Sequence, residues 1–210
     1  MNLWYKIYFC LLIFCFFFGF FNLKYLQRSN KLILLLLFFT ITVEILAFFL
    51  GNKNINNVWL YHLFMPIELI LFLSSFNYLK NKSISIVLGI ISITLMFLNS
   101  IFFQPFLGSF PSHGFVILCV NITFISIHYF YNLLMVGDTF YFRSSKFWVA
   151  IGFLIFSILN LFLLGTFDFL VKNFDSLETV LSSIRFLSNY LLYSFIIFSF
   201  YISIKYEFPK

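Results

Sequence analysis

The sequence predicts an all-α integral membrane protein, a bundle of seven transmembrane helices with the N-terminus outside and the C-terminus in the cytoplasm. Of its 210 residues, 62% are hydrophobic and 10% are charged, and the mean hydropathy is +1.03, above the range of ordinary soluble domains. The apolar residues form stretches of about 20, which at about 1.5 Å per residue cross a hydrocarbon core of about 30 Å. Lysine and arginine gather in alternate connections, which sets the orientation.

Polar connections such as "GNKNINN" (51–57) and "QPFLGSFPSHG" (104–114) separate the apolar stretches. The expected spans are 3–22, 31–50, 57–79, 84–103, 113–135, 147–166 and 184–205. Together they make a single transmembrane domain over residues 1–210, with no soluble domain expected. The last span is expected to begin as a helix about two turns early, because Asp175 and Glu178 form a capping-box pattern.

The positive charges distinguish the two sides of the membrane. Nine lysines and arginines lie in the connections after the first, third and fifth spans and at the C-terminus, whereas the other side holds Lys6, Lys53 and Lys172, with Arg185 at its edge. The positive-inside rule therefore predicts an inner (plasma) membrane protein with its C-terminus in the cytoplasm. No small-x-small cleavage site follows Lys6, so we expect the first span to be retained rather than removed as a signal peptide.

The motifs that carry catalytic or cofactor chemistry are missing from the sequence. Cys10, Cys15 and Cys119 lie within spans and lack CxxC spacing, and no HExxH motif occurs. His62 and His128 are expected at depths of about 8 and 24 Å, too far apart to share a haem iron. We therefore expect no cofactor, metal or catalytic residue, and an enzyme is the least favoured class. The net charge of +6 is explained by the connections, so nucleic acid is not an expected partner.

Polar residues inside the spans recur at helical spacing, so each span except the first has a polar stripe. In hydrocarbon such stripes turn toward one another, since lipid offers no hydrogen-bond partner. Counted from the outer ends, most of these residues lie in the outer half of the bundle. The predicted ligand-binding residues are Glu44, Tyr61, His62, Glu68, Asn99, Asn121, Asn160, Arg185, Asn189 and Tyr193. The first span is expected at the periphery.

Two interpretations of the stripes remain open: an outward-facing cavity, or a hydrogen-bond network that only holds helices together. For the charged residues we favour a function, since ionisable groups inside a membrane are costly. His62 could instead be an interfacial side chain that reaches outward. Glu68, two residues after Pro66, has the weakest structural explanation.

In general plan the chain resembles small bacterial seven-helix membrane proteins of the sensor type. Its distinctive patches are Glu44, "YHLFMPIEL" (61–69) and "RFLSNYLLY" (185–193). The resemblance implies a seven-helix architecture and no defined activity, and it assigns no residue a role.

Three functions are consistent with this pattern. A receptor-like or regulatory subunit would bind a small ligand in the outer pocket and act on a membrane or cytoplasmic protein partner. A small-solute or proton-coupled transporter would use Glu44 and Glu68 to bind a cation, with His128 and Asn132 continuing the path inward. An accessory subunit would pair its stripes with another chain. A pocket closed below Glu68 would favour reception, and a continuous polar path would favour transport.

Overall fold

The computed structural model describes residues 3–76, 82–136, 141–173 and 177–207. Within them the chain forms seven α-helices and no strands. The helices are α1 (Leu3–Phe21), α2 (Arg28–Asn52), α3 (Trp59–Phe76), α4 (Lys82–Phe102), α5 (Ser112–Val136), α6 (Ser145–Asn173) and α7 (Leu177–Ile202). Two 3₁₀ turns, Leu23–Tyr25 and Tyr141–Arg143, and a π-helical end, Ser203–Glu207, complete the described structure.

The expected helices are all present, with changed ends. α6 continues to Asn173 and α7 begins at Leu177, so both extend beyond the predicted limits of 166 and 184. The early start of α7 confirms that this helix begins about two turns before the apolar span; Asp175 of the predicted capping box lies outside the described residues. The predicted residues 77–79 of the third span also lie outside them.

Six of the seven helices are long and apolar enough to cross a membrane: all except α4. Within the described side chains, the apolar part of α4 is the shorter stretch Ile86–Phe102. Large apolar side chains cover the outside of the bundle, among them Ile90, Leu134 and Phe162, each at least half exposed. Such a surface suits lipid, because hydrocarbon imposes no cost on exposed apolar groups.

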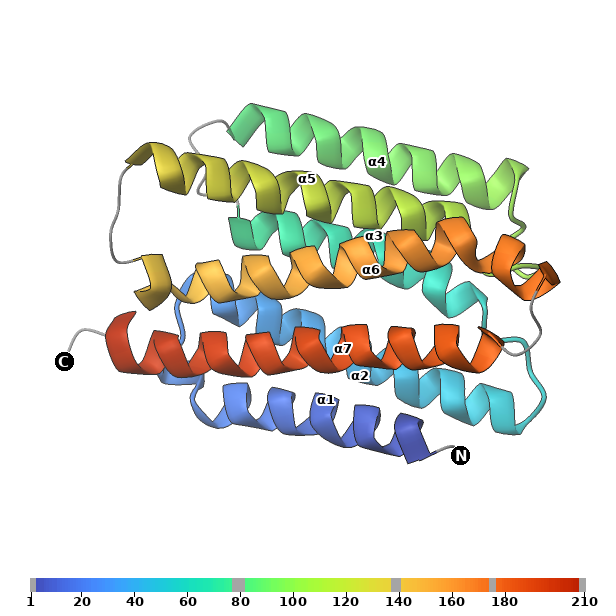
Figure 1. Cartoon of the computed structure of the whole chain (residues 1–210), viewed down its shortest axis with the longest axis horizontal. Helices are drawn as coiled ribbons and strands as arrows, with labels where there is room; N and C mark the ends of the chain where they lie inside the picture. The colour runs from blue at the N-terminus through green and yellow to red at the C-terminus, as the bar shows by residue number, and fades with distance from the viewer. Residues whose placement is uncertain (1–2, 77–81, 137–140, 174–176, 208–210) are drawn as a thin grey trace.

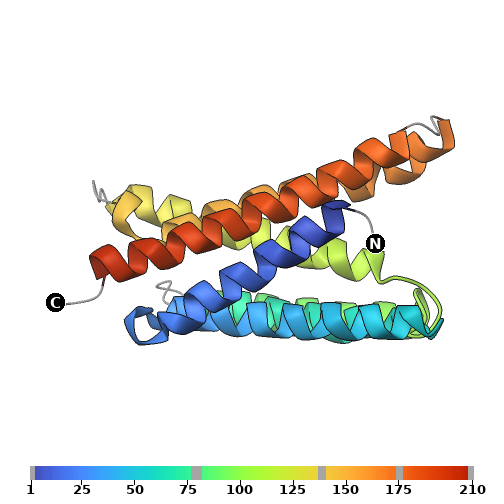
Figure 2. The same ribbon diagram turned by 90° about the horizontal axis from the view of Figure 1, so that it is seen from below.

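Six helices pack as a ring in the order α1, α2, α3, α5, α6 and α7, and α7 closes the ring by packing on α1. α4 lies outside this ring, against α3 and α5 (Figure 1). Seen from below, α2, α3 and α4 form one layer and α6 and α7 another, while α1 and α5 run obliquely between them (Figure 2). The layers diverge toward the end of the bundle that carries the N-terminus.

The centre of the ring is filled with aromatic and aliphatic side chains. Phe72 and Phe200 are fully buried, Phe153 is 1% exposed, and the rings of Phe72 and Phe153 lie 4.8 Å apart. At the end opposite the N-terminus, the Ser145 N–H donates to Glu207 Oε1 at 2.7 Å, and Ser199 Oγ donates to Asn30 Oδ1 at 3.2 Å. These contacts join α2, α6 and α7 and hold that end of the ring together.

The α6–α7 contact depends on a glycine. A Cβ atom added at Gly152 would lie 2.8 Å from Phe195 Cβ, which is fixed to the backbone of α7. Gly152→Ala would therefore have to push the two helices apart, and we expect a loss of about 1–3 kcal/mol of unfolding free energy. Reversible unfolding of the purified protein in mixed micelles measures this loss.

Gly89→Ala on α4 is the matched control. There a Cβ atom would lie 2.8 Å from Leu73 Cδ1, the mobile end of a side chain that can turn away. Its loss of stability should be clearly smaller than that of Gly152→Ala. Equal losses would show that backbone approach does not limit the α6–α7 packing.

Candidate functional site

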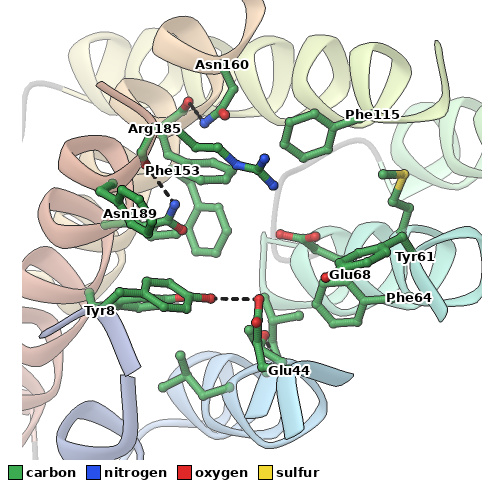
Figure 3. A pocket seen from close by; sticks show the side chains of 18 of the residues that line it. Tyr8, Glu44, Tyr61, Phe64, Glu68, Phe115, Phe153, Asn160, Arg185 and Asn189 are labelled. Atoms are coloured by element: carbon green, nitrogen blue, oxygen red, sulfur yellow. Dashed lines mark hydrogen bonds between the residues drawn. The ribbon is translucent and has the colours of Figure 1, made fainter. Parts of the chain in front are cut away.

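A cavity of about 390 Å³ lies inside the ring, near the end where the layers diverge (Figure 3). All six ring helices and the connection before α5 supply side chains to it, whereas none of the described side chains of α4, residues 86–102, does. Its polar lining consists of Tyr5, Tyr8, Thr40, Glu44, Tyr61, Glu68, Asn160, Arg185, Asn189 and Tyr193. Aromatic and aliphatic side chains make up the rest. The volume falls in the range of small-molecule pockets, about 300–1,000 Å³.

Seven of the ten predicted site residues line this cavity. They are Glu44, Tyr61, Glu68, Asn160, Arg185, Asn189 and Tyr193. They come from α2, α3, α6 and α7, so the structure brings together polar stripes that are far apart in the sequence. Glu44, Glu68 and Arg185, the three charged residues of the prediction, share the same hollow.

The other three, His62, Asn99 and Asn121, are absent from the cavity because each faces the contacts between α4 and its neighbours. Asn121 Oδ1 accepts a hydrogen bond from Ser92 of α4 at 3.1 Å. Asn99, on α4, donates to Gln104 at 2.9 Å. These residues take part in hydrogen bonds between helices and connections, the second of the two interpretations of the polar stripes given above.

His62 is a structural contact rather than an outward-reaching side chain. It is 4% exposed, its Nε2 donates to the Ser109 carbonyl oxygen at 3.0 Å, and its Nδ1 lies 2.7 Å from Ser100 Oγ. The Phe106 ring lies 5.2 Å away. His62 therefore joins α3 to α4 and to the connection before α5, and it is not among the side chains that line the cavity.

Glu44 is held by two tyrosines of α1. Tyr5 Oη donates to Glu44 Oε2 at 3.1 Å and Tyr8 Oη to Oε1 at 3.0 Å. Tyr193 Oη of α7 lies 3.4 Å from Tyr8 Oη and donates to it. The Glu44 carboxyl group thus joins α2 to α1, and Tyr8 extends this hydrogen-bond network from α1 to α7.

Sequence reasoning missed Tyr5 and Tyr8. The first span was expected at the periphery without a polar stripe, and α1 does lie at one edge of the bundle (Figure 1). Yet Tyr8 is 6% exposed and both tyrosines line the cavity. Their spacing of three residues places them on one helical face, which is the signal that could have identified them.

Glu68 is a buried acidic group of the cavity lining. It is 8% exposed and its carboxyl group points into the hollow (Figure 3). It makes no hydrogen bond or ion pair with any residue in the described ranges 3–76, 82–136, 141–173 and 177–207. Burying a polar group without a partner costs free energy, so this position is hard to explain by stability.

Arg185 lies at the edge of the cavity and is anchored through its backbone. Its carbonyl oxygen accepts hydrogen bonds from Ser188 Oγ at 2.8 Å and Asn189 Nδ2 at 2.9 Å. Asn160 of α6 in turn donates to Ser188 Oγ at 3.3 Å. The turn of α7 that carries Arg185 is therefore fixed to α6, while its guanidinium points into the cavity (Figure 3).

The cavity has an apolar floor. Leu37, Phe153 and Ile196 line its inner side, and below them Leu69 and Ile33 are completely buried. His128 and Asn132, the residues expected to extend a path inward, are not part of the lining. His128 instead stacks on Phe124, with ring centroids 6.4 Å apart.

A scan against known protein families finds no matching model, and neither curated proteins nor solved structures include a match to this chain. Among the side chains that the structure describes, no three His, Cys, Asp or Glu residues are grouped as a metal site would require. A proposal for the function therefore has to rest on the geometry of the cavity.

Proposed function

We propose that this chain is a seven-span membrane protein that binds a small molecule in its outward-facing cavity and acts as a receptor-like or regulatory subunit. The observation that carries the proposal is Glu68, a buried carboxyl group that has no partner among the described residues and points into a hollow of ligand size. Ionisable groups inside a membrane are rare and usually functional. The surrounding aromatic side chains and convergent polar groups are typical of small-molecule pockets.

The proposed topology places the cavity toward the outside of an inner (plasma) membrane. α4 is taken as a seventh span, and the lysines and arginines of alternate connections place the C-terminus in the cytoplasm. The cavity is lined by Tyr5 and Tyr8 in the first turns of α1. It therefore lies toward the end of the bundle that carries the N-terminus (Figure 1), which this topology puts outside.

The closed floor favours reception over transport. A transport path needs polar groups or water across the whole membrane. At the inner side of the cavity, Phe153 of the lining packs on the fully buried Phe72, with ring centroids 4.8 Å apart. The inward position of Glu68 also argues against a purely accessory subunit, since its carboxyl group faces the cavity and not a neighbouring chain. Ligand-dependent shifts of the ring helices would then act on a membrane or cytoplasmic protein partner.

Thiol labelling tests the access to the cavity. In a Cys10→Ser background the two remaining cysteines, Cys15 and Cys119, are completely buried. We expect Glu68→Cys to react with a charged, membrane-impermeant methanethiosulfonate added outside intact cells, and not with the same reagent added to inside-out vesicles. Mass spectrometry of the protein measures the labelled fraction.

His128→Cys in the same background is the control, and it should stay unlabelled from outside because the apolar floor separates it from the cavity. Labelling of position 68 from both sides would indicate a transport path and contradict reception. Labelling from the cytoplasmic side alone would show that the proposed orientation is reversed. Protection of position 68 from both sides would contradict an outward-facing cavity.

A further inference from the structure

Two opposite charges face the same cavity without meeting. Glu68 projects from α3 and Arg185 from α7, and Figure 3 shows both side chains directed into the hollow from these two helices. No ion pair joins Arg185 to a carboxylate among the side chains that the structure describes. Glu68 is buried whereas Arg185 is an exposed side chain, so water weakens the attraction between them.

The two helical turns that carry these side chains are packed in place. Glu68 lies between Met65, 4% exposed, and Leu69, which is fully buried, so its helical turn is packed in place. The turn that carries Arg185 is fixed to α6 through Ser188. The helical turns that carry the acidic and the basic side chain are therefore held in place, and both side chains line the same space of about 390 Å³.

The second acidic group is already occupied. Both oxygens of Glu44 accept hydrogen bonds from Tyr5 and Tyr8. The hydroxyl groups hold the Glu44 carboxyl group against α1, so Glu68 and Arg185 are the acidic and basic side chains of the lining that have no side-chain partner among the described residues. The wall between them is mainly aromatic and includes Phe115 and Phe153.

This arrangement specifies the chemistry of a complementary molecule. A guanidinium binds a carboxylate or phosphate through paired hydrogen bonds. A carboxyl group accepts hydrogen bonds from an ammonium group, and neighbouring aromatic faces add cation–π attraction. The apolar wall suits an aromatic or branched aliphatic group between the charged ends.

We propose that the cavity binds a zwitterion, with its ammonium group at Glu68, its acidic group at Arg185 and an apolar group against the aromatic wall. The inference rests on the proposed function and names its ligand class. A free amino acid with a bulky side chain and the headgroup of phosphatidylethanolamine both carry this chemistry. The two sources are separated experimentally.

Three probes of matched shape test the charge requirement: L-phenylalanine, 2-phenylethylamine, which lacks the carboxylate, and 3-phenylpropanoate, which lacks the ammonium. Binding is measured by calorimetry on the full chain in phosphatidylglycerol nanodiscs, a lipid without an ammonium group. We expect phenylalanine to bind at least about 10-fold more tightly than either analogue, since each lost charged hydrogen bond weakens binding by about that factor. In a second arm, short-chain phosphatidylethanolamine competes with phenylalanine or is titrated alone.

Two variants assign the ends of the ligand. Arg185→Gln should abolish the preference for phenylalanine over 2-phenylethylamine, and Glu68→Gln the preference over 3-phenylpropanoate. Glu207→Gln, which changes an acidic residue at the opposite end of the bundle, should leave both preferences unchanged. A variant that removed both preferences equally would indicate a general loss of structure, which circular dichroism of the same sample would reveal.

The outcomes separate the ligand class from the proposed function. Binding of phosphatidylethanolamine without phenylalanine supports the zwitterion and identifies a lipid source. Binding of 2-phenylethylamine or 3-phenylpropanoate as tight as that of phenylalanine overturns the zwitterion while a ligand cavity remains. Absence of binding by all four probes also overturns it, and in that case labelling of the Glu68→Cys variant from outside would still support the cavity itself.

Discussion

Glu68→Met is expected to make the free protein more stable and to abolish its ligand binding. Methionine has about the length of glutamate and no carboxyl group, so it removes a buried polar group that lacks a partner among the described residues. We expect a gain in unfolding free energy of at most about 1–3 kcal/mol, the cost of a fully buried group, because water in the cavity hydrates part of the carboxyl group. Reversible unfolding in mixed micelles measures the stability, and calorimetry with the probes above measures the binding.

Leu69→Met is the control for methionine on this helix, because Leu69 is fully buried beside Glu68 and does not line the cavity. It should cost less than about 1.5 kcal/mol, as volume-conserving exchanges usually do, and leave binding intact. A large loss of stability in Glu68→Met would contradict the assignment, since it would show that Glu68 supports the fold. Binding sites commonly hold groups that lower stability.

Glu44→Met is expected to have the opposite effect on stability. The substitution leaves the hydroxyl groups of Tyr5 and Tyr8 without the acceptor that ties α1 to α2. With two hydrogen bonds to a charged group lost, at about 1.5–3 kcal/mol each, we expect a loss of at least about 3 kcal/mol of unfolding free energy. The same unfolding assay measures it.

Glu44→Gln separates the charge from the hydrogen-bond acceptor, because the amide oxygen can still accept from one tyrosine. Its loss should be about half that of Glu44→Met. In a double-mutant cycle with Tyr8→Phe, the losses of Glu44→Met and Tyr8→Phe should fall short of additivity by about 1 kcal/mol or more. Full additivity would show that the two groups do not interact, and the proposed link between α1 and α2 would be wrong.

The expected changes in unfolding free energy have opposite signs for Glu68→Met and Glu44→Met. The sequence alone does not distinguish these two residues. Both are acidic, both lie inside apolar stretches, and both were predicted to bind a ligand. Glu44 has two tyrosine donors and a role in holding α1, whereas Glu68 has none among the described residues. Only the packing of α1 on α2 and α7 reveals the difference.

The sequence was sufficient to predict the seven helices and seven of the polar side chains that line the cavity. Apolar stretches of about 20 residues predict helices because the backbone must satisfy its own hydrogen bonds in hydrocarbon. Helical spacing places Tyr61 and Glu68, seven residues apart, on one face, and both line the cavity. Both α6 and α7 extend beyond their apolar spans. The sequence predicted this extension only for α7, where a capping pattern precedes the helix.

The tertiary structure decided which polar faces share a space. Periodicity identifies a face of a helix but not the neighbour that it meets, because neighbours are set by contacts between segments distant in the chain. α3 illustrates this: His62 and Glu68 lie about 120° apart around the helix, and the ring turns one toward α4 and the other into the cavity. The exclusion of α4 from the ring removed His62, Asn99 and Asn121 from the site, and the closure of α1 on α7 added Tyr5 and Tyr8.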